Sequence, residues 1–598
     1  MSGRFVVLSL LVLIPSAAAT APTTPVDPRV DRVERGLRPV VWFEGDPLWT
    51  LAERMEHYGT PGISVAVIED GKIAWYRGWG VADRETGEPV TADTLFQAGS
   101  VSKPVAALGA VRMAADGLLA LDGNVNDTLE SWKVPENEFT RESPVTLTGL
   151  LSHTAGLTVH GFPGYAAGDP LPTIVQVLDG HPPANTAAVR VDSLPGSNWR
   201  YSGGGYTVAQ LLMSDAADRP FEVLMRETVL EPLEMKRSTF ENPLPPAKLA
   251  AAAAGILPDG SAVKGKRHVY PEMAAAGLWT TAEDLARFGI EVQQALAGRG
   301  RVLSREAAEL LVEPVTPGYG RGFGLWTRED GAYFGHNGWD EGFCAQLTLS
   351  RDGRHGAALM INSNHPDLMT ELVNAIAHEY GWPGYRAYVP RPIDRGALKR
   401  YSGRFRYNSE QSFAVERKGK RLFMQYVGGD PEELLHIGDG RFMRRGRTAP
   451  ITFTETNGVV EFHFLLPDGG RQSHPQLAQD AVMPRELRAR GDYDRAVAAY
   501  RAILDADAND AAASEDYLNN TGLGLVDEGH HEVGTDLLRV AADLYPQSAN
   551  TWDSLGYAWR VRGDDEQALE YYRLALERDP GFPSAVAAVA ELVGGQGD

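Results

Sequence analysis

The chemistry that this chain offers most directly is that of a serine and a lysine three residues apart, Ser100 and Lys103. An apolar, alanine-rich stretch follows them and predicts a helix, on which residues at positions i and i+3 lie one turn apart on the same face. The lysine amine can then approach the serine hydroxyl, which is a poor nucleophile until a base takes its proton. This S-x-x-K arrangement indicates acyl transfer to Ser100, whereas the alternative is a serine that only caps a helix.

The order of short motifs around this pair supports the catalytic interpretation. A pattern with two fixed positions arises often by chance, so the pair is not specific on its own. Four signals accompany it in sequence order, and they are Asp93-Thr-Leu-Phe-Gln-Ala-Gly99, Leu151-Ser-His-Thr-Ala-Gly-Leu157, Tyr201-Ser-Gly203 and His336-Asn-Gly338. Together they predict one active site that is assembled from segments far apart in the chain.

With these motifs, residues 45–385 closely resemble the penicillin-recognising serine hydrolases. That family includes class C β-lactamases, D-alanyl-D-alanine carboxypeptidases, D-aminopeptidases and esterases of β-lactamase type. Its three motifs fall, in order, on Ser100 and Lys103, on Tyr201, and on His336 and Gly338. The third motif is K-T-G or H-x-G, and the histidine form is more similar to the D-aminopeptidase branch. The resemblance implies that His336 lines the pocket and that Gly338 lets the substrate backbone approach an edge strand.

The resemblance also implies how the remaining motif residues act. Tyr201, with Lys103 stabilising its phenolate form, would take the Ser100 proton and return it to the leaving group. The backbone N–H groups of Ser100 and Trp339 would form the oxyanion hole, where such donors typically contribute about 3–4 kcal/mol of transition-state stabilisation. We expect no metal or organic cofactor, because the protein supplies the nucleophile, the base and the oxyanion donors.

One position departs from the family pattern. The usual Tyr-x-Asn motif is Tyr201-Ser-Gly203 in this chain. The family asparagine hydrogen-bonds the amide carbonyl of the substrate and touches the lysine. Its absence weakens the expectation of β-lactam or D-Ala-D-Ala recognition and favours an ester or a different peptide.

Four other polar residues near the motifs are weighed for a chemical role. His153 belongs to a family motif that shapes the fold, so we expect a hydrogen-bonded structural histidine rather than a general base. Cys344 lies in an alternating strand-like run and is expected to fill one face of that strand. Asp340 and Glu341 follow the third motif, where a contact with a substrate amine is one interpretation and solvated loop charges are the favoured one.

The elements that must position these residues belong to a mixed domain. Strand-like runs such as residues 63–68 occur together with alanine- and leucine-rich helical stretches at 102–116 and 206–216. With the family resemblance, they predict an α/β (α+β) sandwich of the β-lactamase/transpeptidase type, in which helices flank an antiparallel sheet. The nucleophile would lie at a helix start between an all-α and an α/β region.

A small β-rich module is predicted at residues 395–475. Short alternating runs separated by glycine and aspartate turns indicate antiparallel strands, which fit a small barrel. The block resembles the lipocalin-like C-terminal domains of some peptidases of the same family.

An internal repeat predicts a helical module at residues 484–595. Gly529 and Pro546 recur as Gly563 and Pro580, each 34 residues later, which is the tetratricopeptide period. Stacked repeats of this kind leave a groove that commonly receives peptides or partner helices. We therefore expect a protein partner for this groove, with a stabilising spacer as the alternative.

Composition and the N-terminus indicate an exported protein. Residues 1–19 form a secretory signal pattern, with a cut expected after Ala19. The formal charge of −22 disfavours nucleic acid, and the single cysteine excludes an internal disulfide. A periplasmic or secreted bacterial protein is expected, with no membrane span once the signal is removed.

The function predicted from the sequence is that of an exported serine hydrolase acting through a Ser100 acyl-enzyme. Its substrate would be a small molecule or peptide, and the bond could be that of a D-amino-acid peptide, a β-lactam or a small ester. The alternative is a catalytically weak or inactive hydrolase fold that serves as a tetratricopeptide-based protein-binding module in the cell envelope.

Overall fold

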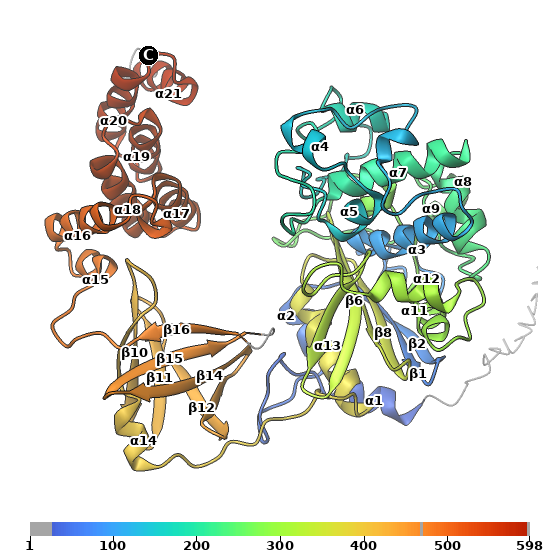
Figure 1. The fold of residues 1–598 in the computed structure, drawn as a ribbon, viewed down its shortest axis with the longest axis horizontal. Coiled ribbons are helices and arrows are strands. Elements are labelled where there is room, and N and C mark those ends of the chain that lie inside the picture. Colours follow the sequence, from blue (N-terminus) through green and yellow to red (C-terminus); the bar gives the residue numbers. More distant parts are fainter. Residues whose placement is uncertain (1–26, 467–469, 595–598) are drawn as a thin grey trace, which may run out of the picture. The chain divides into compact units, whose positions relative to one another are not determined.

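The computed structural model describes residues 27–466 and 470–594 (Figure 1). The predicted signal segment, residues 1–19, lies outside the described residues. Within the described ranges, no helix combines the length and the apolar character that crossing a membrane requires.

The chain divides into two compact units, and the division does not follow the sequence in a single cut. The first unit holds the described residues up to Arg38 together with Pro47–Arg386. The second unit holds Pro39–Asp46 together with the chain from Ala387 onward. A short N-terminal segment, which the sequence did not assign, therefore belongs to the second unit.

The first unit is built on a six-stranded antiparallel sheet with the order β2-β1-β8-β7-β6-β5. Its strands are β1 (Gly62–Glu69), β2 (Lys72–Gly80), β5 (Gly324–Arg328), β6 (Gly331–Asp340), β7 (Phe343–Ser350) and β8 (His355–Ile361). The first and last parts of the unit meet in the middle of the sheet, where β1 pairs with β8. Strands β1, β7 and β8 are apolar and almost entirely buried, which indicates that both faces of the sheet are covered.

Helices pack on both faces of this sheet (Figure 1). Helix α11 (Ala282–Leu296) packs against β1, β7 and β8, and its Leu285 and Phe288 share a core cluster with Ala66 and Ile68 of β1. Helix α13 (Pro366–Glu379) also contacts β7 and β8, but its buried side chains lie outside that cluster, which places it on the other face. The antiparallel sheet flanked by helices matches the expectation from the sequence.

A helical layer is inserted between β2 and β5. It is centred on α3 (Ser102–Ala115) and α7 (Gly203–Ala217), which correspond to the helical stretches predicted at 102–116 and 206–216. The other elements of this unit are α1 (Pro28–Glu34), α2 (Leu51–His57), β3 (Phe96–Gln97), η1 (Gly99–Val101), η2 (Val125–Asp127), α4 (Glu138–Glu142), α5 (Leu147–Ser152), α6 (Ile174–Asp179), α8 (Phe221–Met225), η3 (Arg226–Leu230), α9 (Pro246–Leu249), α10 (Met273–Ala276), β4 (Trp279–Thr280) and α12 (Arg305–Val312).

The second unit begins with a nearly closed eight-stranded antiparallel barrel, in which every strand pairs with its neighbour in sequence. After α14 (Arg395–Arg400), the strands are β9 (Gly403–Arg406), β10 (Ser412–Lys418), β11 (Arg421–Tyr426), β12 (Glu432–Gly438), β13 (Arg441–Arg444), β14 (Arg447–Thr456), β15 (Val459–Leu465) and β16 (Arg471–Pro475). Its core is rich in phenylalanine, including Phe405, Phe413 and Phe462. The barrel expectation is met, and its lipocalin-like identity stays a prediction.

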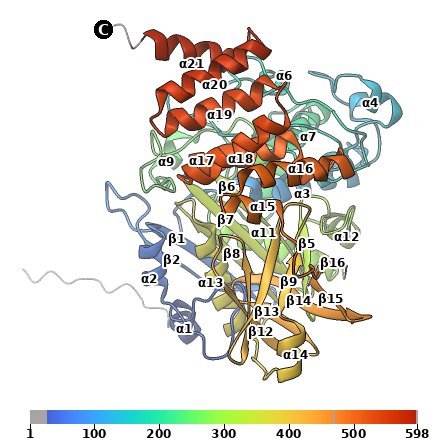
Figure 2. The ribbon, with the colours of Figure 1, turned by 90° about the vertical axis from the view of Figure 1, so that its left-hand side faces the viewer.

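The C-terminal part of this unit is a succession of helices, each packed on the next (Figures 1 and 2). They are α15 (Pro484–Ala489), α16 (Tyr493–Ala506), η4 (Ala511–Ala513), α17 (Glu515–Asp527), α18 (His531–Leu544), α19 (Ala549–Val561), α20 (Asp565–Arg578) and α21 (Pro583–Gly594). Helices α17 and α19 begin 34 residues apart, and so do α18 and α20. The helical region is present, and its tetratricopeptide identity stays a prediction.

Candidate active site

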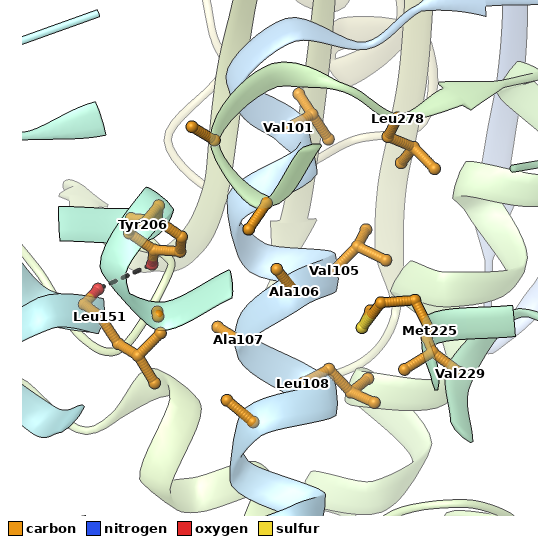
Figure 3. Close-up of a cluster of buried hydrophobic side chains, with 14 of the residues drawn as sticks. Val101, Val105, Ala106, Ala107, Leu108, Leu151, Tyr206, Met225, Val229 and Leu278 are labelled. Atoms are coloured by element: carbon orange, nitrogen blue, oxygen red, sulfur yellow. Dashed lines mark hydrogen bonds between the residues drawn. The ribbon is translucent and has the colours of Figure 1, made fainter. Parts of the chain in front are cut away.

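The serine at the centre of the predicted site lies in a single 3₁₀ turn that leads into a buried helix. Ser100 is the middle residue of η1, and α3 begins two residues later. Figure 3 shows side chains of α3, such as Val105 and Leu108, packed among apolar side chains of other elements, which include Leu151, Met225 and Leu278. The alanines of α3 let these elements approach closely, so the helix that follows the nucleophile and carries Lys103 is buried among them.

The Lys103 amine is fixed against the Ser100 hydroxyl. Lys103 is 2 % exposed, and its Nζ donates hydrogen bonds to Ser100 Oγ at 2.9 Å and to the carbonyl of Ala275 at 2.7 Å. Ser100 does not cap α3, because Val101 is the N-cap residue and makes no side-chain cap hydrogen bond. The helix-cap alternative for Ser100 is therefore wrong, and the predicted i, i+3 contact is present.

Tyr201 lies beside this amine. The residue immediately precedes α7, whose N-cap Ser202 accepts a hydrogen bond from the N–H of Gly205. The Lys103 Nζ lies 4.9 Å from the centre of the Tyr201 ring, within the range of a cation–π contact. The ring is flanked by the imidazoles of His153, at 4.2 Å, and His160, at 4.9 Å between centroids.

Strand β6 brings its backbone directly against the turn that holds the serine. A Cβ added to Gly338 would lie 1.9 Å from the Ala98 carbonyl oxygen and 3.2 Å from the Ser100 nitrogen. Gly99 has φ +50, and a Cβ there would lie 2.5 Å from the Trp339 nitrogen. Glycine is required at both positions, and the backbone N–H groups of Ser100 and Trp339 consequently lie on adjoining segments, as two oxyanion donors must.

The glycine that replaces the family asparagine is enclosed by another part of the chain. A Cβ on Gly203 would lie 3.0 Å from the Phe162 ring and 3.1 Å from the carbonyl oxygen of His160. The segment 160–162 therefore occupies the space that a larger side chain would need. The site has no amide side chain at this position, and the His160 ring packs on Tyr201 instead.

His336 is the end of a hydrogen-bonded row of aromatic side chains. Its Nε2 lies 3.0 Å from the Tyr319 hydroxyl, and the same hydroxyl lies 3.2 Å from His153 Nε2. The backbone N–H of Ser202 donates to His153 Nδ1 at 3.1 Å. Burial, and next the charge of Lys103, lowers the pKa of His336 to about 3 and holds the pKa of His153 well below its usual value. Both imidazoles are uncharged at neutral pH.

Two carboxyl groups are buried at the ends of elements that pack on η1. Asp340 shares the β6 face of His336 and Gly338, and it is 2 % exposed, whereas Glu272 precedes α10 and is fully buried. Among the described residues, their carboxyl oxygens accept no hydrogen bond of good geometry. Burial raises the pKa of Asp340 well above its usual value, against the opposing charge of Lys103, and raises the pKa of Glu272 to about 7.

The expectation of solvated loop charges is therefore wrong for Asp340. The residue is the last one of strand β6, which the sequence pattern ended earlier, and the inward alternation of the strand carries it into the protein. Glu341 is half-buried in the following turn, where its backbone N–H donates to the Tyr270 hydroxyl at 2.9 Å.

Cys344 is a buried packing residue. It is 1 % exposed on β7, and its Sγ contacts the side-chain amide of Asn364 at 3.8 Å. Burial raises the pKa of the thiol to about 12, so the reactive thiolate is not populated at neutral pH. The structural role expected for this cysteine is present.

Two residues of the site were not found by sequence reasoning. Tyr319 lies in the turn Pro317-Gly318-Tyr319-Gly320, which reads only as a loop, and Glu272 precedes a helix of one turn. Neither belongs to a pattern with catalytic spacing. Their positions follow from long-range packing, 166 residues from His153 in the case of Tyr319.

Comparisons with known proteins identify the family of the chain. The family model described as Beta-lactamase matches residues 50–380, more than half of the chain. Penicillin-binding protein 4* of Bacillus subtilis (strain 168) is 24 % identical over 465 residues, covering 71 % of this chain and 96 % of its own. Penicillin-binding protein 4 of Amycolatopsis lactamdurans is 28 % identical, covering 58 % and 94 %. Esterase EstB of Burkholderia gladioli is 29 % identical, covering 44 % and 74 %. The chain belongs to the Beta-lactamase family, and its fold is that of these serine hydrolases.

Proposed function

We propose that this protein is an exported serine hydrolase that forms an acyl-enzyme on Ser100 and acts on ester or amide bonds. The observation that carries the proposal is the 2.9 Å hydrogen bond from Lys103 Nζ to Ser100 Oγ, made by an amine that is 2 % exposed and also held by the Ala275 carbonyl. A buried amine fixed against a serine hydroxyl has no need to be there for packing alone, because burying a charge-bearing group is unfavourable.

The groups of the site support a complete acyl-transfer cycle. Ser100 Oγ attacks the carbonyl carbon of the substrate, and its proton passes to Lys103 or Tyr201 and then to the departing alcohol or amine. The negative oxygen that forms is stabilised by the N–H groups of Ser100 and Trp339. Water then attacks the acyl carbon, one proton of that water returns to Ser100 Oγ, and the carboxylic acid leaves.

A small ester or an uncharged amide is the substrate class that the pocket favours. His336 occupies the place of the third-motif side chain as a neutral ring, so it offers no positive charge to a substrate carboxylate. Gly203 offers no side-chain amide, and the segment 160–162 fills the space beside it. We therefore rank esters before D-amino-acid peptides and β-lactams, and turnover of p-nitrophenyl esters, D-Ala p-nitroanilide and nitrocefin compares the three.

Intact-mass spectrometry of the full mature chain tests the acyl-enzyme directly. A fluorophosphonate probe is expected to add one label that Ser100→Ala loses. Ser102→Ala is the matched control, because the Ser102 hydroxyl lies in the same motif but is engaged by the N–H of Leu278 at 2.9 Å. Labelling by penicillin as well would move the substrate toward cell-wall peptides or β-lactams. No label on the wild type would overturn the proposal.

A role in protein binding is the second candidate. The 34-residue spacing of α17 and α19, and of α18 and α20, supports a tetratricopeptide array that receives a partner peptide or helix. In that case the hydrolase fold would be weak or inactive, and the unlabelled outcome above would bring this function forward. Export itself is tested by N-terminal sequencing of the mature protein, with Thr20 expected as the first residue.

A further inference from the structure

A row of four hydrogen bonds joins the two sides of the site, and it consists of Ser202 N–H, His153, Tyr319, His336 and the Asn337 carbonyl. The atom pairs are Ser202 N to His153 Nδ1 (3.1 Å), His153 Nε2 to Tyr319 Oη (3.2 Å), Tyr319 Oη to His336 Nε2 (3.0 Å) and His336 Nδ1 to Asn337 O (2.6 Å). We propose that Tyr319 and His153 are positioning residues that hold His336 in one tautomer, with the proton on Nδ1 and the lone pair on Nε2.

The direction of every bond follows from the two ends of the row. A backbone N–H can only donate, so His153 Nδ1 must be the acceptor and its proton lies on Nε2. That proton is donated to Tyr319 Oη, which leaves the tyrosine proton for the next acceptor, His336 Nε2. The His336 proton then lies on Nδ1 and is donated to the Asn337 carbonyl, which can only accept. No other assignment gives each donor one acceptor.

A protonated imidazole at either position breaks this row. A proton on His153 Nδ1 would face the N–H of Ser202, placing two donors against each other. A proton on His336 Nε2 would make Tyr319 Oη accept from both rings and leave its own proton without the acceptor that it has now. Buried polar groups left unpaired are unfavourable, so the row itself resists a charge on either ring.

The surroundings act in the same direction. Lys103 is the positive group that faces both imidazoles, and Tyr201, Tyr206 and Trp199 pack around His153. Burial and the lysine charge lower the pKa of both rings, and burial holds the pKa of the Tyr319 hydroxyl well above its usual value. The tyrosine therefore keeps its proton, which the bond to His336 requires.

The row connects the segment of the proposed base to the strand of the proposed oxyanion hole. Ser202 follows Tyr201 directly, and His336 lies two residues before Gly338 on β6. If the proposed function holds, His336 is a fixed, neutral side chain that lines the pocket. Both of its ring nitrogens are engaged in hydrogen bonds, so it does not carry a proton during the reaction. Tyr319 acts through His336 and does not itself touch the reacting atoms.

Two-bond ¹H–¹⁵N spectra of the full chain, labelled with ¹⁵N only at histidine, test the tautomers without any substrate. In the wild type, His336 is expected to show a protonated Nδ1 and an unprotonated Nε2 down to at least pH 5, and His153 is expected to show the reverse at pH 7. Tyr319→Phe is expected to shift the Nε2 signals of both rings. Tyr333→Phe is the matched control, since Tyr333 is on the same strand as His336 and its hydroxyl donates only to the Pro383 carbonyl, at 2.7 Å.

Kinetics separate positioning from a merely structural role. Tyr319→Phe is expected to lower kcat on a p-nitrophenyl ester about 10-fold with little change in KM, because the half-buried imidazole of His336 loses its partner. His153→Asn keeps an acceptor for the Ser202 N–H, and asparagine tolerates the left-handed backbone of this position (φ +62). The variant therefore separates loss of the bond to Tyr319 from loss of the bond to Ser202. It is expected to reproduce the kcat loss.

Either of two results would overturn the inference. One is a wild-type His336 with its proton on Nε2, or with both nitrogens protonated near pH 7. The other is a Tyr319→Phe chain whose two imidazoles keep their wild-type signals. These outcomes are independent of the acyl-enzyme, because Ser100 labelling tests the reaction and the ring nitrogens test the row.

Discussion

Two buried glutamates of the first unit differ in whether their surroundings provide hydrogen bonds to the carboxylate. Glu291, on α11, is 4 % exposed, and its carboxylate accepts backbone N–H bonds at 2.7 to 3.1 Å from Arg301, Val302 and Leu303. Glu272, the residue before α10, is fully buried and accepts no such bond among the described residues. The loop after α11 provides backbone donors for Glu291, whereas the surroundings of Glu272 provide none of good geometry.

The difference indicates where the fold gives up stability. A buried polar group without a partner destabilises by about 1–3 kcal/mol, and most buried groups in proteins are paired for that reason. Here neither Glu272 nor Asp340 accepts a hydrogen bond of good geometry among the described residues, and Lys103 lies close enough for its charge to act on Asp340. Local rules that fail at one place, while they hold elsewhere in the same unit, are typical of functional sites.

The largest expected effect comes from removing the Lys103 amine. Lys103→Ala should lower kcat/KM on a p-nitrophenyl ester by about 10³-fold, because the amine that activates Ser100 and its hydrogen bond to the Ser100 hydroxyl are lost. Lys248→Ala is the control, since Lys248 Nζ also donates to a backbone carbonyl, that of Arg237 at 2.7 Å. A Lys103→Ala enzyme within tenfold of wild type would show that the amine does not serve the reaction.

The second prediction concerns the pH dependence of stability. Because the folded pKa of Glu272, about 7, lies above its value of 4.5 in an unfolded chain, the folded state binds more protons between these pH values. The contribution of Glu272 to the free energy of unfolding should therefore fall by about 3 kcal/mol as the pH rises from 4.5 to above 7. Glu272→Gln should make the decline seen in urea unfolding curves smaller by that amount, and an equally steep decline in the variant would contradict the assignment.

Glu291→Gln is expected to change the free energy of unfolding in the opposite direction from Glu272→Gln. An amide accepts the same backbone N–H bonds less strongly than a carboxylate, so the variant should lose about 2 kcal/mol of unfolding free energy at pH 8. At that pH Glu272→Gln should be more stable than wild type. If both variants change the free energy of unfolding in the same direction, the contrast between the environments of Glu291 and Glu272 is wrong.

The smallest expected effect is the coupling between the two acids of the site. The charge of Glu272 raises the pKa of Asp340, so the two carboxylates repel each other when both are ionised. Removing either charge relieves the same repulsion, so Glu272→Gln and Asp340→Asn together should gain about 1 kcal/mol less than their sum at pH 8. Strict additivity in the double-mutant cycle would place the two carboxyls in independent environments.

The sequence predicts those parts of the site that local periodicity controls. Ser100 and Lys103 are one helical turn apart, and the alternation of β6 puts His336 and Gly338 on one face, so their spacing alone indicates a shared site. Tyr319 and Glu272 have no such periodicity, because they reach the site from a turn and from the residue before a short helix. Asp340 was misjudged because the end of a strand is set by pairing with β7, which a single sequence does not show.

The same holds for the fold. The central helices and the alternating barrel strands follow from apolar patterns within each element. The assignment of residues 39–46 does not, because it depends on pairing over long range: Phe43 bridges to Tyr388, and Val41 and Phe43 pack on Met443. Nothing in an eight-residue segment indicates which of two units it will join.

That short segment sets an order of events during biosynthesis. Met443 is made about 400 residues after Phe43, which takes about 20–80 s at a typical rate of about 5–20 residues per second. The apolar side chains of this segment are therefore made long before the residue that covers them. A fragment that starts at Ala387 would also lack this cover, so the beginning of the chain completes a unit that is otherwise encoded at its end.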